Sequence, residues 1–132
     1  MAIFQSSEQL YAVLDQVFTR VTANPANIAA FTHSNLVIRL RTTEPEVEVL
    51  LDGRQPPLEV FYGPRPGKAN LEVLLQADLL HAIWIGKQSA SQAFFGGQVK
   101  TQGNLLKAAQ LIELFRECER VYAEVAQAHQ LV

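Results

Sequence analysis

Four segments between residues 36 and 75 place apolar side chains at every second position, and this pattern constrains the fold more than any other feature. They are Leu36–Arg41, Glu46–Leu51, Leu58–Tyr62 and Leu71–Leu75. A period of two puts alternate side chains on opposite faces of a β-strand, so each segment is predicted to be a strand with one buried face. The turn-rich linkers between them are far shorter than a parallel crossover requires, which predicts antiparallel pairing.

Helical spacing of apolar residues appears on both sides of these strands. A first helix is predicted to begin after Ser6, a suitable N-cap, and to end near Pro25, which could start a short turn through Phe31. Two further helices are predicted over Asp78–Ile85 and Leu105–Ala128.

The segment Gly86–Asn104 joins the last two helices and has no helical period of its own. Within it, Gln98–Gln102 is typical of a short fifth strand that stops at Gly103, and Asn104 can cap the last helix. These elements predict an α+β fold, in which helices cover one face of a five-stranded, mostly antiparallel sheet. At 132 residues, the chain is expected to form one domain over 1–132.

Charge and cysteine content exclude several classes of protein. The formal net charge is −2, so the chain carries no basic excess for nucleic acid. The single cysteine, Cys118, cannot form an internal disulfide and fits a reducing compartment.

The N-terminus resembles no signal peptide, the last three residues are not a peroxisomal Ser-Lys-Leu address, and no apolar run approaches the roughly 18 residues of a membrane span. A cytoplasmic location is therefore expected.

Catalytic and metal-binding motifs are missing from the sequence. It contains no Gly-x-Ser-x-Gly, Cys-x-x-Cys or His-Glu-x-x-His, and Cys118 is expected to pack in the last helix. Asp78 and His81 lie one helical turn apart but are too few for a metal site, so we expect Asp78 to cap its helix and His81 to lie on the surface. We expect no metal and no cofactor.

Two charged features have structural explanations. The loop Gly63–Lys68 has only three residues between its glycines and two prolines that remove N–H donors, so it is not a phosphate-binding loop. Arg39 and Arg41 are predicted to pair across strands with glutamates, of which Glu46, Glu48 and Glu59 are the candidates.

Large aromatic side chains stand in or beside the irregular segments. They are Phe18, Phe31, Trp84, Phe94 and Phe95. They would line either a filled core or a ligand cavity, and periodicity does not distinguish these alternatives because both need the same apolar lining.

A set of residues around the fifth strand resembles a known family. Gly86, the step Ala93-Phe94-Phe95, the pattern Gly97-x-Val99-Lys100-x-x-Gly103-Asn104, and then Ala108 and Leu111 are similar to the signature of the sterol carrier protein type two family. The resemblance is dense over Asp78–Leu114 and rests elsewhere on the order and length of the elements.

The resemblance implies a five-stranded sheet covered by helices that enclose an apolar tunnel for sterols, fatty acids or acyl-CoA. Phe94, Val99, Leu105 and Leu111 would lie on or near that tunnel. Ala90 and Gln98 depart from the proline and lysine common in relatives, and Leu106 replaces a glycine and could narrow the tunnel. The candidate lipid-binding residues are Phe18, Phe31, Ile83, Trp84, Phe94, Phe95, Val99, Leu105, Leu106, Leu111, Ile112 and Phe115.

Three functional hypotheses follow from the apolar surface and the resemblance. The first is a non-catalytic carrier of a hydrophobic ligand, such as a fatty acid, acyl-CoA, isoprenoid or sterol-like lipid. The second is an accessory module that presents a lipid or quinone-type intermediate to enzymes, with a homodimer as one form of its apolar interface. The third, a lipid-modifying enzyme, has no recognisable nucleophile and base. Transient contact with a membrane is compatible with the first hypothesis, and no nucleic-acid partner is expected.

Overall fold

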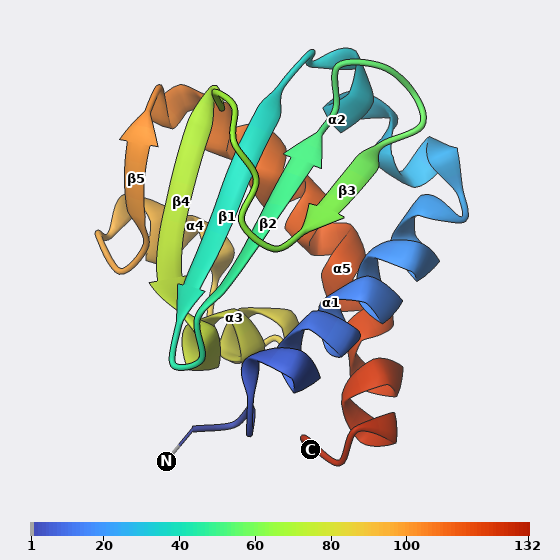
Figure 1. Ribbon diagram of the computed structural model, residues 1–132, viewed down its shortest axis with the longest axis vertical. Helices are drawn as coiled ribbons and strands as arrows, with labels where there is room; N and C mark the ends of the chain where they lie inside the picture. Colours follow the sequence, from blue (N-terminus) through green and yellow to red (C-terminus); the bar gives the residue numbers. More distant parts are fainter. Residues whose placement is uncertain (1) are drawn as a thin grey trace.

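Five strands form one sheet in the order β3-β2-β1-β4-β5 in the computed structural model, which describes residues 2–132 (Figure 1). The strands are β1 Val37–Thr43, β2 Val47–Asp52, β3 Glu59–Tyr62, β4 Leu71–Gln76 and β5 Lys100–Gly103. The pairs β1–β2, β2–β3 and β4–β5 are antiparallel, and β1 and β4 are parallel. The prediction of a five-stranded, mostly antiparallel sheet is confirmed.

The central pair β1–β4 is where the antiparallel expectation is wrong. That expectation came from the short linkers between consecutive strands, but β1 and β4 are not consecutive. The chain between Thr43 and Leu71 contains β2 and β3, so it is long enough to return to the start of β1 and run beside it in the same direction.

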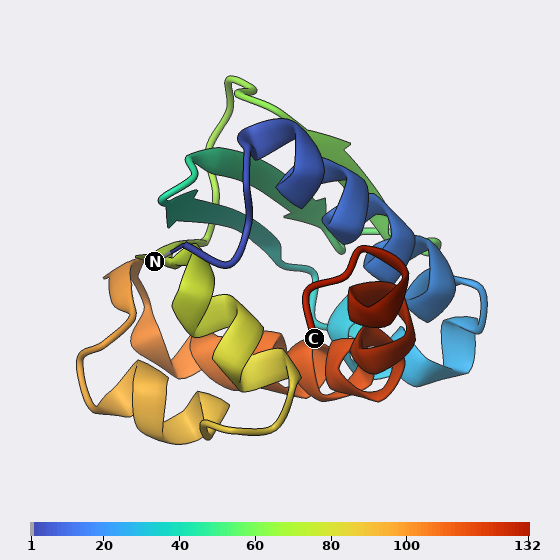
Figure 2. The ribbon, with the colours of Figure 1, turned by 90° about the horizontal axis from the view of Figure 1, so that it is seen from below.

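Helices cover one face of the sheet, as the sequence predicts (Figure 2). They are α1 Ser7–Thr22, α2 Ala29–His33, α3 Ala77–Trp84, α4 Ala90–Phe95 and α5 Ala108–Ala128, with single 3₁₀ turns at Pro25–Ile28 and Leu105–Lys107. Both α1 and α3 pack against α5. Among residues 2–132, no helix is long and apolar enough to cross a bilayer.

Side chains cap the predicted helix starts. The Ser6 hydroxyl accepts a hydrogen bond from the Gln9 N–H at 3.1 Å, so α1 begins where expected. The Asn104 side chain accepts from the Leu106 N–H at 3.0 Å and caps the 3₁₀ turn that leads into α5.

The segment between α3 and α5 differs from the prediction in two ways. It contains the short helix α4, whose N-cap Ser89 accepts from the Gln92 N–H at 3.3 Å. A helix of six residues is too short to show a helical period in the sequence. In addition, the last strand begins at Lys100 rather than Gln98 and includes Gly103.

The core lies between the sheet and the helix layer. The inner face of the sheet contributes fully buried branched side chains, namely Ile38, Leu40, Val49, Leu51, Leu71 and Val73. These side chains belong to one contiguous apolar cluster with the buried faces of α1, α3 and α5. Tight interior packing therefore holds the helices on the sheet.

The opposite face of the sheet is centred on Arg39. Its guanidinium lies 3.5 Å from the carboxylates of both Glu48 and Glu72 and donates to the carbonyl oxygens of Arg65 and Gly67. The predicted cross-strand pair of Arg39 and Glu48 is confirmed. The other predicted pairings, of Arg41 with glutamate and of arginine with Glu46 or Glu59, are wrong: within residues 2–132 these three side chains form no ion pair.

Candidate functional site

Aromatic rings fill the space between α1, α3, α4 and α5. The Trp84 ring of α3 meets the rings of Phe18, Phe115 and Tyr122 edge-on, with centroid distances of 6.2, 5.4 and 5.3 Å. Phe94 of α4 continues the cluster through Phe115 at 6.1 Å. The structure thus brings together four of the predicted aromatic or apolar site residues in one buried aromatic cluster, and Tyr122 is a member that sequence reasoning did not single out.

A polar pair borders this aromatic cluster. The Nδ1 atom of His81 lies 2.7 Å from the Tyr122 hydroxyl, and both side chains are buried. Burial lowers the pKa of His81 from its usual value, against a smaller opposing effect of the nearby Asp78 carboxylate, and burial raises the pKa of Tyr122. His81 is therefore an interior neutral imidazole, and the prediction of a surface position is wrong.

The N-terminal segment covers this polar pair. The Ile3 N–H donates to the Asp78 carboxylate at 2.9 Å, and the Phe4 ring packs edge-on against His81 at 6.0 Å. The prediction that Asp78 caps α3 is wrong, because the N-cap position is Gln76. Instead, its carboxylate anchors the segment before α1. Sequence reasoning missed both the Ile3–Asp78 hydrogen bond and the contact of Phe4 with His81, because no local sequence pattern relates residues that are so far apart in the chain.

Trp84 carries an unusual polar atom in this apolar interior. Its ring is almost fully buried, and among the described residues its Nε1 is the only buried side-chain nitrogen or oxygen without a hydrogen-bond partner. A buried, unpaired N–H costs about 1–3 kcal/mol relative to its hydrated state. The interior therefore holds one unused donor at the centre of the aromatic cluster.

The predicted site residues divide into a buried set and an exposed set. Nine are buried, namely Phe18, Phe31, Ile83, Trp84, Phe94, Val99, Leu111, Ile112 and Phe115. Three are exposed: Leu106 at 80%, Phe95 at 59% and Leu105 at 38%. Phe31 lies apart from the aromatic cluster, against Gly53, where an added Cβ would come within 2.6 Å of its ring.

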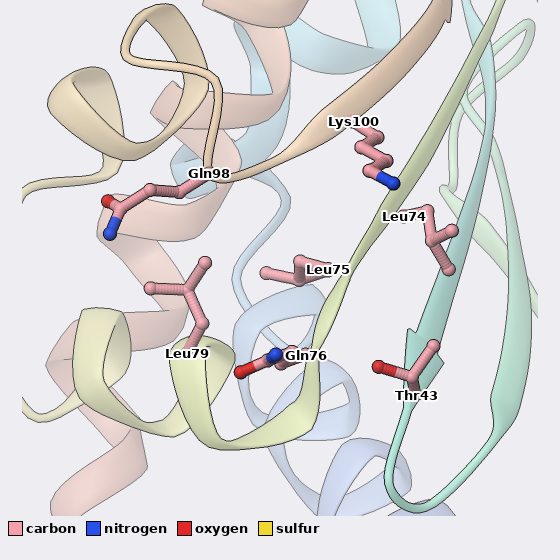
Figure 3. Close-up of a pocket in the computed structure, with 7 residues that line it drawn as sticks. All are labelled: Thr43, Leu74, Leu75, Gln76, Leu79, Gln98 and Lys100. Carbon is pink, nitrogen blue, oxygen red and sulfur yellow. The ribbon is translucent and has the colours of Figure 1, made fainter.

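One hollow of about 400 Å³ opens at the end of β4, between the sheet and α3 (Figure 3). We call it the β4-edge hollow, and its lining residues are Thr43, Leu74, Leu75, Gln76, Leu79, Gln98 and Lys100. Pairing of β4 with β5 covers only Leu71 to Leu74, so the edge of β4 is not paired with β5 beyond that point. Leu75 faces the core there, and the half-buried Leu79 of α3 lies next to it.

A second hollow of about 320 Å³ lies between the α3–α4 connection and α5. It contains three predicted site residues, Ile83, Ile112 and Phe115, at the edge of the core. Its remaining lining is largely polar and includes Arg116 and Glu119. The β4-edge hollow is the more apolar of the two, because three leucines line it. Sequence reasoning missed the β4-edge hollow. Leu74 and Leu75 belong to a strand and Leu79 to a helix, and no sequence pattern predicts that the three leucines lie close together.

Catalytic and metal-binding sites use thiol, imidazole and carboxylate side chains. Burial raises the pKa of the Cys118 thiol, which lies fully inside the α5 stripe, as predicted for a packing cysteine. Within residues 2–132, no group of three or more histidine, cysteine, aspartate or glutamate side chains is placed to hold a metal.

Comparisons with solved structures show the fold. The apo form of sterol carrier protein 2 from Yarrowia lipolytica superposes with a TM-score of 0.63 and 19% identity, covering 86% of this chain and 91% of that one. The sterol carrier protein domain 2 of Helicoverpa armigera gives a TM-score of 0.62 and 18% identity, with coverages of 82% and 88%. A ubiquinone synthesis protein named UbiJ-SCP2 gives 0.59 and 19%, with coverages of 80% and 87%.

The sequence comparison assigns the family. A search of curated proteins finds no match. The model of the SCP-2 sterol transfer family matches residues 14–116, which is most of the chain and includes the segment around β5 that carries the resemblance. This chain therefore belongs to the SCP-2 sterol transfer family.

Proposed function

We propose that this chain binds a hydrophobic ligand between its sheet and its helices and passes it on without covalent chemistry. The ligand classes are a fatty acid, an acyl-CoA, an isoprenoid or a sterol-like lipid. The observation that carries the proposal is the β4-edge hollow, where an inner-face leucine, Leu75, and the α3 leucine, Leu79, meet at a part of the β4 edge not covered by β5. Membership of the SCP-2 sterol transfer family supports it.

The contacts of the helix layer support access to the interior from this hollow. Within residues 2–132, no side-chain hydrogen bond joins α3 or α5 to a strand, so apolar packing holds these helices on the sheet. Moving α3 outward at Leu79 would break dispersion contacts but leave no strand donor or acceptor unpaired. An acyl chain placed in the opening would restore apolar contact and gain about 0.8 kcal/mol for each buried CH₂.

The interior chemistry supports holding rather than converting the ligand. The walls are aliphatic and aromatic, and the thiol of Cys118 is buried with a raised pKa, so little thiolate is present to attack an ester. We propose the nine buried residues predicted from the sequence as the walls of the ligand-bound state, and Leu74, Leu75 and Leu79 as its opening. The three exposed candidates, Phe95, Leu105 and Leu106, are not part of this proposed site.

The test compares two leucine substitutions. Leu79→Gln places an amide at the opening, whereas Leu106→Gln changes an exposed leucine outside the β4-edge hollow. We expect Leu79→Gln to weaken binding of the fluorescent fatty acid cis-parinaric acid about tenfold, which corresponds to about 1.4 kcal/mol, and Leu106→Gln to leave it unchanged. Equal effects of both, or an effect of Leu106→Gln alone, would contradict this opening.

Exposed apolar side chains favour a second candidate, an accessory module that presents a lipid or quinone-type intermediate to enzymes. Phe95, Leu105 and Leu106 are all exposed within the short stretch from 95 to 106. One structural neighbour is named a ubiquinone synthesis protein. Light scattering distinguishes the candidates: a homodimer or a stable complex that Leu106→Gln dissociates would support the module, and a strict monomer without a co-purifying partner would oppose it.

A further inference from the structure

We propose that the ligand is an anionic amphiphile, a carboxylate or phosphate on an aliphatic chain, and that Lys100 binds its headgroup at the mouth of the β4-edge hollow. This inference rests on the proposed function and narrows its ligand class. The aliphatic chain would pass Leu75 and Leu79 toward the core, while the headgroup stays at the sheet edge. The supporting observations are the position of Lys100, the residues that line the hollow, and the ion pairs around it.

Lys100 stands at the point where the hollow meets the open face of the sheet. It is the first residue of β5, and its Cα pairs with that of Leu74 on β4. The partner of Leu74 on the other side is Arg41 of β1. Paired residues point to the same face of a sheet, so two cations flank one half-buried leucine. Figure 3 shows the Lys100 side chain extending toward Leu74.

The lining of the hollow combines one cation with apolar and neutral polar groups and contains no carboxylate. Its three leucines suit an aliphatic chain, and Thr43, Gln76 and Gln98 provide neutral hydrogen-bonding groups beside the Lys100 ammonium. The Gln98 side-chain oxygen accepts from the Gln88 amide, so the Gln98 amide nitrogen remains as its donor. Neutral donors and a cation beside leucine side chains at the edge of β4 match an anion that carries an alkyl chain.

Two neighbouring acids on the same face of the sheet are held by Arg39, and the exposed Glu46 lines the adjoining hollow with Arg41, outside the lining of the β4-edge hollow. Glu72, two residues before Leu74 on β4, and Glu48, the β2 partner of Arg41, both lie 3.5 Å from Arg39. Glu48 also accepts from the Arg65 N–H. Within residues 2–132, neither Lys100 nor Arg41 forms an ion pair. Because the whole chain has a net charge of −2, these two cations, Lys100 and Arg41, do not belong to a generally basic protein.

The experiment compares two ligands with sixteen carbons each, one with an anionic carboxylate headgroup and one with a neutral hydroxyl. Binding of palmitate and of 1-hexadecanol, both below their aggregation limits, is followed by the fluorescence of Trp84, the only tryptophan. The proteins are the unsubstituted chain, Lys100→Met, and the control Lys107→Met, which removes an exposed lysine outside the hollow. Matched thermal unfolding of the three proteins verifies that folding is unchanged.

The proposal predicts that the unsubstituted chain binds palmitate about tenfold more tightly than 1-hexadecanol. Lys100→Met should remove this difference by weakening palmitate alone, and Lys107→Met should preserve it. Equal affinity for both ligands in the unsubstituted chain, or a preference that survives Lys100→Met, would overturn the headgroup assignment while leaving the proposed function standing. Failure to bind either ligand would overturn both.

Two further probes identify the source of the anion. Inorganic phosphate should compete with palmitate only weakly, and hexadecyl phosphate should compete strongly, because the chain supplies most of the affinity. Equal competition by the two would overturn the proposal of an amphiphilic ligand and would indicate that the hollow binds free anions. Binding to phosphatidylglycerol vesicles that depends on Lys100, without saturable binding of monomeric palmitate, would also overturn it and assign the cations to a membrane surface.

Discussion

The hydroxyl of Tyr122 contributes to the fold through one interior hydrogen bond. It lies 2.7 Å from His81 Nδ1, and no other partner of that nitrogen is present among the described residues. Tyr122→Phe keeps the ring but leaves His81 Nδ1 buried without a partner. We expect the free energy of unfolding to fall by about 1–3 kcal/mol in urea denaturation. The double variant Tyr122→Phe/His81→Phe should recover part of this loss, and a single substitution without effect would contradict the pair.

His81 also gives the fold a dependence on pH. Burial lowers its pKa in the folded protein below the ordinary value of 6.5, so between the two values the unfolded chain binds more protons than the folded chain. The contribution to stability is complete above about pH 6.5 and is lost as the pH falls toward the lowered folded pKa. Each pH unit in this window removes at most about 1.4 kcal/mol.

The measurement is urea denaturation at pH 7.5 and pH 5.5. We expect the unsubstituted chain to lose stability between these values, and His81→Gln to lose less. His33→Gln is the control because His33 is exposed at the end of α2. An identical pH dependence in the unsubstituted chain and in His81→Gln would show that another group causes it.

At the scale of the elements, Gly103 fixes the last strand beside β4. Its φ is +116°, and a Cβ there would lie 2.5 Å from the carbonyl oxygen of Asn70, immediately before β4. Gly103→Ala therefore adds a backbone clash to the strain of a left-handed conformation, and we expect a loss of about 2–4 kcal/mol of unfolding free energy.

Gly67→Ala is a matched control for this substitution. Gly67 has a similar φ of +128°, but nothing lies within 4 Å of an added Cβ. Thermal or urea unfolding should show a clearly smaller loss for Gly67→Ala, because only the backbone strain applies. Equal losses would mean that the contact with Asn70 does not hold β5 in place.

Periodicity predicted most elements, because each strand and long helix has one face toward a common core. The period of two located β1 to β4, and the buried stripes located α1, α3 and α5. The six residues of α4 were too few for a period. The parallel pair β1–β4 was missed because strand order depends on tertiary packing and not on the linkers between neighbours.

Only part of the candidate site could be predicted from the sequence. Apolar character located the buried aromatic cluster around Trp84, and the family resemblance added Phe94 and Val99. The β4-edge hollow was not predicted, because it depends on where β5 stops pairing with β4. His81 was placed on the surface because its neighbours in the sequence do not reveal Phe4 and Tyr122, which cover it from distant segments.

At the scale of the whole molecule, the proposed ligand would occupy space that the packed core now fills. The sheet and helices share one contiguous apolar cluster, so a bound chain would separate the two layers at α3. The aromatic cluster around Trp84 would then contact the ligand, and the unpaired Nε1 would gain access to an acceptor. A change in Trp84 emission on binding is the optical counterpart of that separation.

The most direct test is native mass spectrometry of the protein purified without detergent, followed by denaturing identification of any released lipid. The account predicts a population with about one lipid per chain, dominated by species with an anionic headgroup. Leu79→Gln should reduce that population, and Leu106→Gln should not. Protein that is free of lipid and also fails to bind added palmitate would contradict the central claim, and the interior would then be a filled core.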